Sequence, residues 1–239
     1  MAAVEFTYEW YDDFLAQLRA DRARFRSYDQ SLEEGDVLLR HDVDLSPGRA
    51  LSLGRIEADR DVRATYFLLV SSPLYNPLDQ ETRAVVEELD DLGHDIGLHF
   101  STHQYWDAAD PPTEAALGRR IEEEREVLSS LPIDPIDTVS FHLPPEWVLN
   151  SRIEGVDSAY EPRFFDEIAY CADSNQRWRE EPPLSDGQPE KVQILTHPGL
   201  WGVDDASFER RVRDATDETE ARVDDYARSR YVPEAVVEG

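Results

Sequence analysis

The sequence predicts an α/β protein, a distorted (β/α) barrel of about seven parallel strands folded as a single domain. Three observations predict it. Segments rich in β-forming residues alternate with amphipathic helical stretches along the chain. The length of 239 residues suits one core, and no Gly/Ser linker or low-complexity tract divides it. Polar side chains suited to chemistry stand at or just past the C-terminal ends of the predicted strands, the rim where parallel barrels assemble active sites.

Six segments are predicted as strands, because β-branched, aromatic and aliphatic residues are frequent in them. In chain order they are 36–41, 64–70, 95–99, 138–142, 168–172 and 192–196. A further strand is expected near 157–160. Because this total falls short of a regular barrel, an incomplete or distorted one is favoured.

Five stretches repeat apolar residues at helical spacing, and each is predicted as an amphipathic helix. They are 11–28, 47–58, 78–92, 113–131 and 205–226. The first and the last of these helices flank a core that carries the candidate motifs, at about 36–202, within one domain spanning 1–239. Proline-rich points are predicted as loops at 110–112, 144–146 and 181–183.

The charge balance favours a protein adapted to salt. Its 52 acidic residues against 24 basic ones give a net charge of −28, and Lys191 is the only lysine. Concentrated salt screens such self-repulsion over a Debye length of about 3 Å. We therefore expect a halophilic, cytoplasmic protein; an acidic interaction surface fits less well, because the acids are spread along the whole chain. The same field opposes binding to nucleic acid or to an anionic membrane.

Cysteine content and hydropathy agree with that location. Cys171 is the only cysteine, so no internal disulfide is expected. The N-terminus has no basic region followed by an apolar run, and no stretch approaches the roughly 18 apolar residues that span a bilayer. We expect no membrane insertion, and the sequence leaves the oligomeric state open.

Residues 41–44, His-Asp-Val-Asp, end the first predicted strand and continue just past it. Alternation along a strand places the carboxylates of Asp42 and Asp44 on one side. Two like charges this close are unfavourable unless a cation or a shared proton compensates them. The alternative is that Asp44 is a turn or helix-capping residue before 45–47.

His99 and His103 are four residues apart and share a face if the chain turns helical after the strand. Together with Asp44 they are the two imidazoles and one carboxylate that hold a catalytic divalent metal and leave a position open. Asp42 is then a candidate base for a water molecule. The alternative for the two histidines is a hydrogen-bonded core residue and a surface residue. His94 precedes its strand and is predicted to be structural.

Three further residues are candidates for chemistry. His197 follows the last predicted strand and is a candidate general acid, since imidazole titrates near pH 6.5, unless it only caps the strand. Asp173 is a candidate to orient that imidazole. Trp178 is a candidate to stack on a sugar ring, although a single Trp is more often part of a core. The segment 141–145 is equally consistent with an ordinary passage from strand to loop.

Taken in order, these segments resemble the motif series of the NodB-homology polysaccharide deacetylases, the family-four carbohydrate esterases. The resemblance covers about 36–202 and includes Ala-Thr-Tyr-Phe at 64–67, similar to a strand of that family. Its five motifs correspond to 41–44, 97–103, 140–145, 173–178 and 195–198. It implies a distorted barrel of about seven strands. It also implies a hydrolase that removes an N-acetyl or other acyl group from a sugar, nucleotide-sugar or glycan.

The resemblance implies roles for individual residues as well. Asp44, His99 and His103 would bind a divalent metal, with zinc favoured and cobalt, nickel, iron or manganese as alternatives. Asp42 would be the base that activates water, His197 the acid that protonates the leaving amine, and Asp173 the partner of that histidine. The substrate pocket would be lined by His142, Trp178, Leu195 and Trp201.

Two departures from the family pattern leave alternatives open. Asp42 and Asp44 are separated by one residue where many members have adjacent aspartates. The arginine that pairs with the base in the third motif is replaced by His142 or Leu143. The candidates to take over its role are Arg40, Arg163 and Arg177. The alternatives to a sugar deacetylase are an amide or cyclic-amide hydrolase on the same barrel, and a catalytically weak or silent homologue that binds a glycan or nucleotide-sugar.

Overall fold

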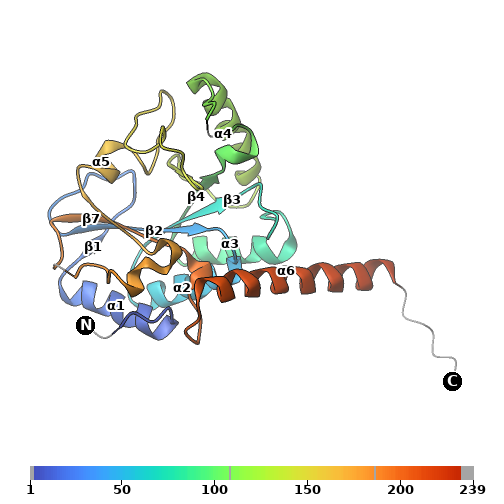
Figure 1. Cartoon of the computed structure of the whole chain (residues 1–239), viewed down its shortest axis with the longest axis horizontal. Coiled ribbons are helices and arrows are strands. Elements are labelled where there is room, and N and C mark those ends of the chain that lie inside the picture. Colours follow the sequence, from blue (N-terminus) through green and yellow to red (C-terminus); the bar gives the residue numbers. More distant parts are fainter. Residues whose placement is uncertain (1–2, 108, 186, 233–239) are drawn as a thin grey trace.

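One curled sheet of parallel strands forms the centre of the computed structural model, which describes residues 3–107, 109–185 and 187–232 (Figure 1). The strand order is β5-β4-β3-β2-β7-β6, and β1 pairs with β2 outside this path. Because β5 and β6 are the two ends of the order, the barrel is open between them. The predicted α/β class and the incomplete barrel are therefore confirmed. The strands are β1 Arg24–Phe25, β2 Asp36–Val43, β3 Thr65–Leu69, β4 Asp95–Phe100, β5 Val139–Phe141, β6 Ala169–Ala172 and β7 Lys191–Thr196.

Side-chain caps fix where most of the long helices begin. Each capping side chain accepts a hydrogen bond from the backbone N–H three residues further on, which satisfies a donor that the helix itself leaves free. The caps are Thr7, Ser46, Asp79, Thr113 and Ser207. The α-helices are α1 Tyr8–Ala20, α2 Pro47–Asp59, α3 Gln80–Asp91, α4 Glu114–Leu128, α5 Pro162–Phe165 and α6 Phe208–Tyr231. Short 3₁₀ helices are η1 Thr102–Gln104, η2 Ser174–Arg179 and η3 Pro198–Leu200.

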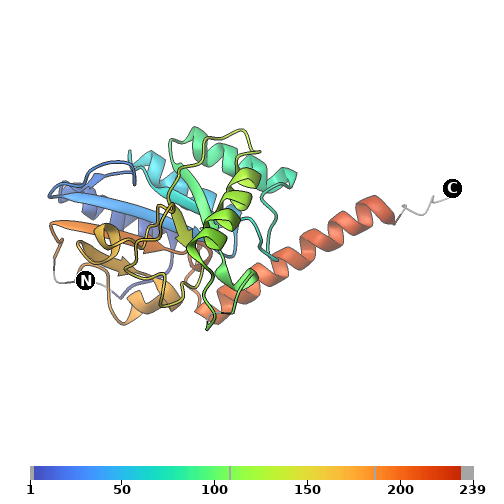
Figure 2. The ribbon, with the colours of Figure 1, turned by 90° about the horizontal axis from the view of Figure 1, so that it is seen from above.

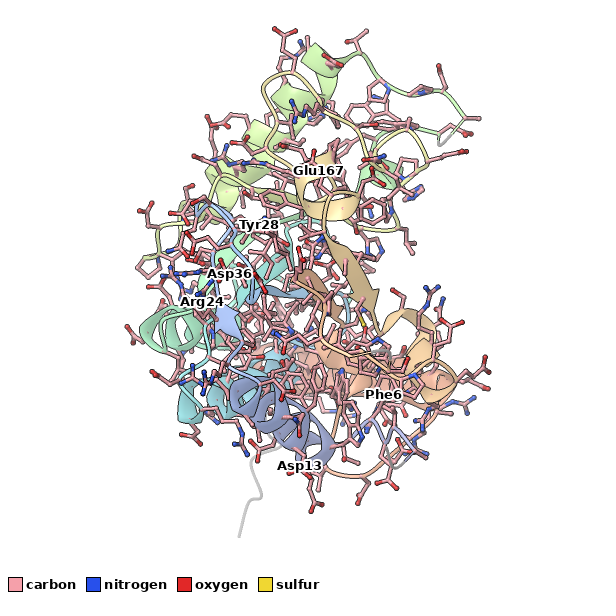
Figure 3. All side chains as sticks on the ribbon, turned by 90° about the vertical axis from the view of Figure 1, so that its left-hand side faces the viewer. Phe6, Asp13, Arg24, Tyr28, Asp36 and Glu167 are labelled. Atoms are coloured by element: carbon pink, nitrogen blue, oxygen red, sulfur yellow. The ribbon has the colours of Figure 1, made fainter. Side chains whose placement is uncertain are left out.

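The first helix is shorter at its C-terminal end than the predicted 11–28. It ends at Ala20, and Arg22 then adopts a left-handed φ of 65° that turns the chain into β1. Figure 3 shows Arg24 of β1 beside Asp36 at the start of β2, where Arg24 Nε donates to Asp36 Oδ1 at 2.8 Å. The apolar periodicity that suggested one long helix therefore combines a helix and a strand.

The strand expected at 157–160 is absent from the described structure as a strand. This segment contributes an isolated parallel bridge between Ser158 and Val139 of β5. The seventh strand of the sheet is β1 instead. The prediction of seven strands was thus right in number and wrong in the position of one.

Strand β2 lies inside the sheet, and all eight of its residues are buried. His41 packs toward α2: its Nε2 lies 2.8 Å from Oε1 of buried Glu57, and its Nδ1 lies 2.6 Å from Thr196 Oγ1. Glu57 also accepts a hydrogen bond from the Tyr66 hydroxyl at 2.7 Å. Side chains alternate along a strand, so Asp42 points to the opposite side. His41 is therefore structural, and Asp42 is available to a site on the other face.

Helix α6 extends beyond the body of the fold. Its first half contacts η3 and, through ion pairs of Arg49 with Asp214 and Glu218, helix α2. Figure 2 shows its C-terminal half projecting away from the sheet. It begins and ends later in the chain than the predicted 205–226. No helix in the described part of the chain is long and apolar enough to cross a membrane.

Candidate functional site

A cavity of about 420 Å³ opens where the parallel strands end. Strands β2, β4 and β5 all run in the same direction, so the residues at their C-terminal ends meet at one rim. The start of α6 and the segment between β5 and β6 also contribute to the walls. The acidic and basic side chains that line the cavity are Asp42, Asp44, His99, His142, Arg177 and His197.

Asp44, His99 and His142 form a cluster that has the chemistry of a metal site. Each offers one ligand atom, and these atoms all lie within 4.8 Å of one another. His99 Nε2 lies 3.1 Å and His142 Nδ1 2.9 Å from Asp44 Oδ1. Burial alone would raise the pKa of Asp44, but hydrogen bonds from His142 and His99 outweigh it and hold that pKa well below its usual range. One ionised carboxylate and two imidazoles fit a divalent metal with an open position.

His103 does not join this cluster. After β4 the chain forms the 3₁₀ helix η1, so the α-helical spacing that would align His103 with His99 is not made. The His103 side chain is exposed instead, with Nε2 2.9 Å from the carbonyl oxygen of Leu143. His142, expected to line the substrate pocket, follows β5, the strand that pairs with β4, and fills the third place beside Asp44. The cluster with Asp44 and His99 therefore contains His142, where the sequence had suggested His103.

Asp42 lies beside the cluster and is held by two donors. Arg40 Nη2 donates to Asp42 Oδ2 at 3.0 Å, and Ser140 Oγ lies 3.0 Å from both carboxylate oxygens. Burial raises the pKa of Asp42, but the charges of Arg40, His99 and His197 outweigh it and keep that pKa below its usual value. Asp42 Oδ2 lies 4.0 Å from His99 Nε2. Asp42 is therefore an ionised carboxylate at the edge of the cluster.

Of the three arginines considered as partners of Asp42, Arg40 is the one that pairs with it. It is fully buried, and its guanidinium also donates to the Tyr160 hydroxyl at 2.7 Å and to Gln193 Oε1 at 3.2 Å. Of the two other candidates, Arg163 pairs with Glu161 at 2.9 Å, and Arg177 lines the cavity. The cation beside Asp42 thus comes from the same strand, β2, two residues before Asp42 in the sequence.

His197 stands on the other side of the cluster. Its Nδ1 lies 2.6 Å from Asp173 Oδ1, and its backbone N–H also donates to that carboxylate at 3.0 Å. Trp201 Nε1 donates to Asp173 Oδ2 at 2.9 Å. Burial lowers the pKa of His197, but the charges of Asp173 and Asp44 and the Asp173 hydrogen bond outweigh it and raise that pKa to about 9. The Asp173 carboxylate therefore favours the protonated form of the ring, whose Nε2 lies 3.9 Å from Asp44 Oδ2.

The two tryptophans predicted for the substrate pocket lie elsewhere. Trp178 and Trp201 are 1% and 0% exposed and pack with Trp10 in an aromatic cluster behind the cavity. Trp178 is therefore a core residue, and Trp201 acts on the site only through Asp173. Leu195, by contrast, lines the cavity.

Other aromatic residues form part of the cavity wall instead: Phe141 of the third motif, and three residues that no motif contained, Tyr160, Phe165 and Tyr170. Three of them come from the segment between β5 and β6 or from β6 itself, at the open side of the barrel. For Tyr160, Phe165 and Tyr170 the only sequence signal was the aromatic content of 158–170.

Comparisons with known proteins give likeness in structure only. No protein-family model matches the chain, and no curated protein matches it. The chain is similar to a chitin deacetylase from Colletotrichum lindemuthianum, with 16% identity and a TM-score of 0.47 over 80% of this chain and 84% of that one. It is similar to the peptidoglycan deacetylase PdaC from Bacillus subtilis, with 14% identity and a TM-score of 0.48 over 83% and 98%. It is also similar to a CE4 family pseudoenzyme from Bacillus anthracis, with 12% identity and a TM-score of 0.43 over 80% and 60%.

Proposed function

We propose that this chain is a metal-dependent hydrolase that removes an acyl group from the nitrogen of an acylated amino sugar. One observation carries the proposal: a carboxylate and a protonated imidazole flank the Asp44 cluster, each within 4.0 Å of one of its members. A metal site with an open position, a proton acceptor and a proton donor is the set of groups that amide hydrolysis requires.

The metal would be held by Asp44, His99 and His142, and when bound it would polarise the acyl carbonyl and acidify the attacking water. Asp42 accepts the proton of that water, while Arg40 and Ser140 keep its carboxylate in place. An ionised carboxylate is ready for this step at any pH above its lowered pKa.

His197 supplies the proton that the departing nitrogen needs. An amine leaves poorly unless it is protonated, so cleavage of an amide requires an acid on the leaving-group side. The Asp173 carboxylate binds Nδ1 and leaves Nε2 directed at the cluster. The charge and hydrogen bond of Asp173 raise the pKa of His197 and so favour the acid form of the ring.

A second candidate is an amide hydrolase whose substrate is not a sugar. The observation that favours it is the burial of Trp178, since this residue was the main sequence signal for sugar stacking. Phe165 and Tyr170, which are half-buried in the cavity wall, still offer aromatic surface to a sugar ring, which keeps the sugar as the favoured substrate. The pairing of Arg40 with Asp42 supports catalysis over a silent binding protein, because a protein that only binds has no need of a positioned base.

The test is acetate release from a panel of N-acetylated sugars and simple N-acetyl amides, at high salt, with and without a chelator. We expect release from at least one sugar, loss of release on chelation, and recovery with added zinc. Asp42→Asn is the matched control, because it removes the acceptor and keeps the side chain's shape. Release that persists after chelation, or an Asp42→Asn variant as active as wild type, would contradict the proposal.

A further inference from the structure

Arg177 differs from the other acidic and basic side chains of the cavity. Each of the others has a partner of opposite charge or a hydrogen-bonded neighbour, as described above. Arg177 also lines the cavity, yet within the described ranges no carboxylate lies within ion-pair distance of it, although most arginines there have one. Arg177 is thus an exposed cation at the cavity with no ion-pair partner among the described residues, in a chain with 52 acidic and 24 basic residues.

The segment that carries Arg177 is held in place by hydrogen bonds to residues 205 and 206. Gln176 Nε2 donates to the Ala206 carbonyl oxygen at 2.8 Å, and the Arg179 guanidinium donates to both carboxylate oxygens of Asp205 at 2.7 and 2.9 Å. Gln176 and Asn175 have left-handed φ values of 58° and 55°, a conformation that non-glycine residues keep only where surrounding contacts hold it.

The side chains of this segment divide between the core and the cavity. Gln176 and Trp178 are buried, whereas Ser174, Asn175 and Arg177 line the cavity. The wall of the cavity therefore contains two residues with neutral hydrogen-bonding side chains next to one arginine. A planar guanidinium with adjacent donors is well suited to bind an oxyanion in a bidentate manner.

We propose that Arg177, with Ser174 and Asn175, binds an oxyanion carried by the substrate, so that the preferred substrate is an acylated amino sugar bearing a carboxylate or a phosphate. This inference rests on the proposed function, whose reacting groups line the same cavity. The oxyanion site would explain why a cation without an ion-pair partner lies here. The net charge of −28 repels an anionic substrate, and a local positive group offsets that repulsion where the substrate binds.

The test is binding measured by calorimetry on the full-length chain as purified, at one fixed high concentration of KCl. The probes are N-acetylglucosamine, N-acetylglucosamine 6-phosphate and N-acetylmuramic acid, which carry no anion, a phosphate and a carboxylate. We expect at least one anionic probe to bind about tenfold more tightly than the neutral one, from the usual strength of charged hydrogen bonds at a partly exposed site. The better of the two anionic probes identifies the anion.

Three variants make the assignment specific. Arg177→Gln should lose the preference for the anionic probe and keep the affinity for the neutral one, whereas Arg177→Lys should retain part of the preference. Arg119→Gln, an exposed position on α4 outside the cavity lining, changes the net charge equally and should behave as wild type. Equal affinity for all three probes, or a preference that survives in Arg177→Gln, would overturn the inference.

Turnover of the same probes with zinc separates this inference from the proposed function. Binding that depends on Arg177 without acetate release from any probe would count against the hydrolase and support the oxyanion site. Acetate release at equal efficiency from neutral and anionic sugars, unchanged in Arg177→Gln, would support the hydrolase and overturn the oxyanion site.

Discussion

Replacement of one histidine at a time decides which imidazoles bind the metal. The structure places His142 in the cluster with Asp44 and His99, and places His103 outside it. Loss of an outer partner of a metal ligand already weakens metal binding by about 10–100-fold, so loss of a direct ligand should cost about 100-fold or more. We therefore expect His142→Ala to weaken zinc binding to that extent, and His103→Ala to leave it close to wild type.

The difference is large enough to measure as thermal stability. Zinc at 100 times its dissociation constant stabilises the native protein by about 2.7 kcal/mol, which for a chain of this length raises Tm by roughly 5–11 °C. At the same zinc concentration, a 100-fold weaker site gains only about 0.4 kcal/mol, or roughly 1–2 °C. The zinc-induced shift should thus nearly vanish in His142→Ala and persist in His103→Ala.

The assay is a thermal melt of each variant with chelator and with zinc, followed by calorimetric titration of zinc. The melt with chelator is the internal control, because it reports any loss of packing caused by the substitution itself. The reverse pattern, a zinc shift lost in His103→Ala and kept in His142→Ala, would refute the ligand set drawn from the structure.

Three other predictions follow from the charges of the site and of the whole chain. Asp173→Asn removes the charge that raises the pKa of His197, so His197 should lose its proton at a lower pH than in wild type. The alkaline limb of the kcat/KM profile should therefore move down by about one to three pH units. A pH–rate profile with an unchanged alkaline limb would argue against His197 as the acid. Arg40→Met leaves Asp42 buried without its cation and should lower the free energy of unfolding by about 3–5 kcal/mol, measured by urea unfolding. The double variant with Asp42→Asn should recover much of that loss, and no recovery would mean that Arg40 acts by packing alone. The net charge of −28 should make Tm fall as KCl is lowered from molar concentrations to about 0.1 M, where the Debye length reaches about 10 Å; a Tm independent of salt would contradict the expected adaptation.

Sequence alone predicted the residues whose position follows from strand alternation and strand ends. Asp42 faces the cavity because its neighbour His41 faces α2, and this parity is fixed once β2 is recognised. His99 and His197 lie at the rim because β4 and β7 end there. In each case one local pattern was enough, since the parallel sheet carries every strand end to the same edge.

The sequence could not place the residues whose position depends on how the chain turns after a strand. His103 would have faced the cluster in an α-helical turn, and the 3₁₀ turn of η1 directs it elsewhere. Trp178 follows two left-handed residues, Asn175 and Gln176, and its side chain is buried in the core, a path of the chain that no sequence pattern indicated. Arg40 was one of three arginines open to the role, and only the packing of β2 against Tyr160 and Gln193 distinguishes it.

Asp42 and His197, the two groups proposed to accept and donate protons, each have a buried partner of opposite charge. Arg40 lowers the pKa of Asp42, and Asp173 raises that of His197, which favours the ionised carboxylate and the protonated imidazole. Environments that push the pKa values of two groups apart are what assigns one as base and the other as acid. Both partners are 0% exposed and fixed by further hydrogen bonds, so neither can be replaced by water. The division of roles is therefore built into the core beneath the site, and a substitution there should alter the pH dependence of the reaction without touching the substrate.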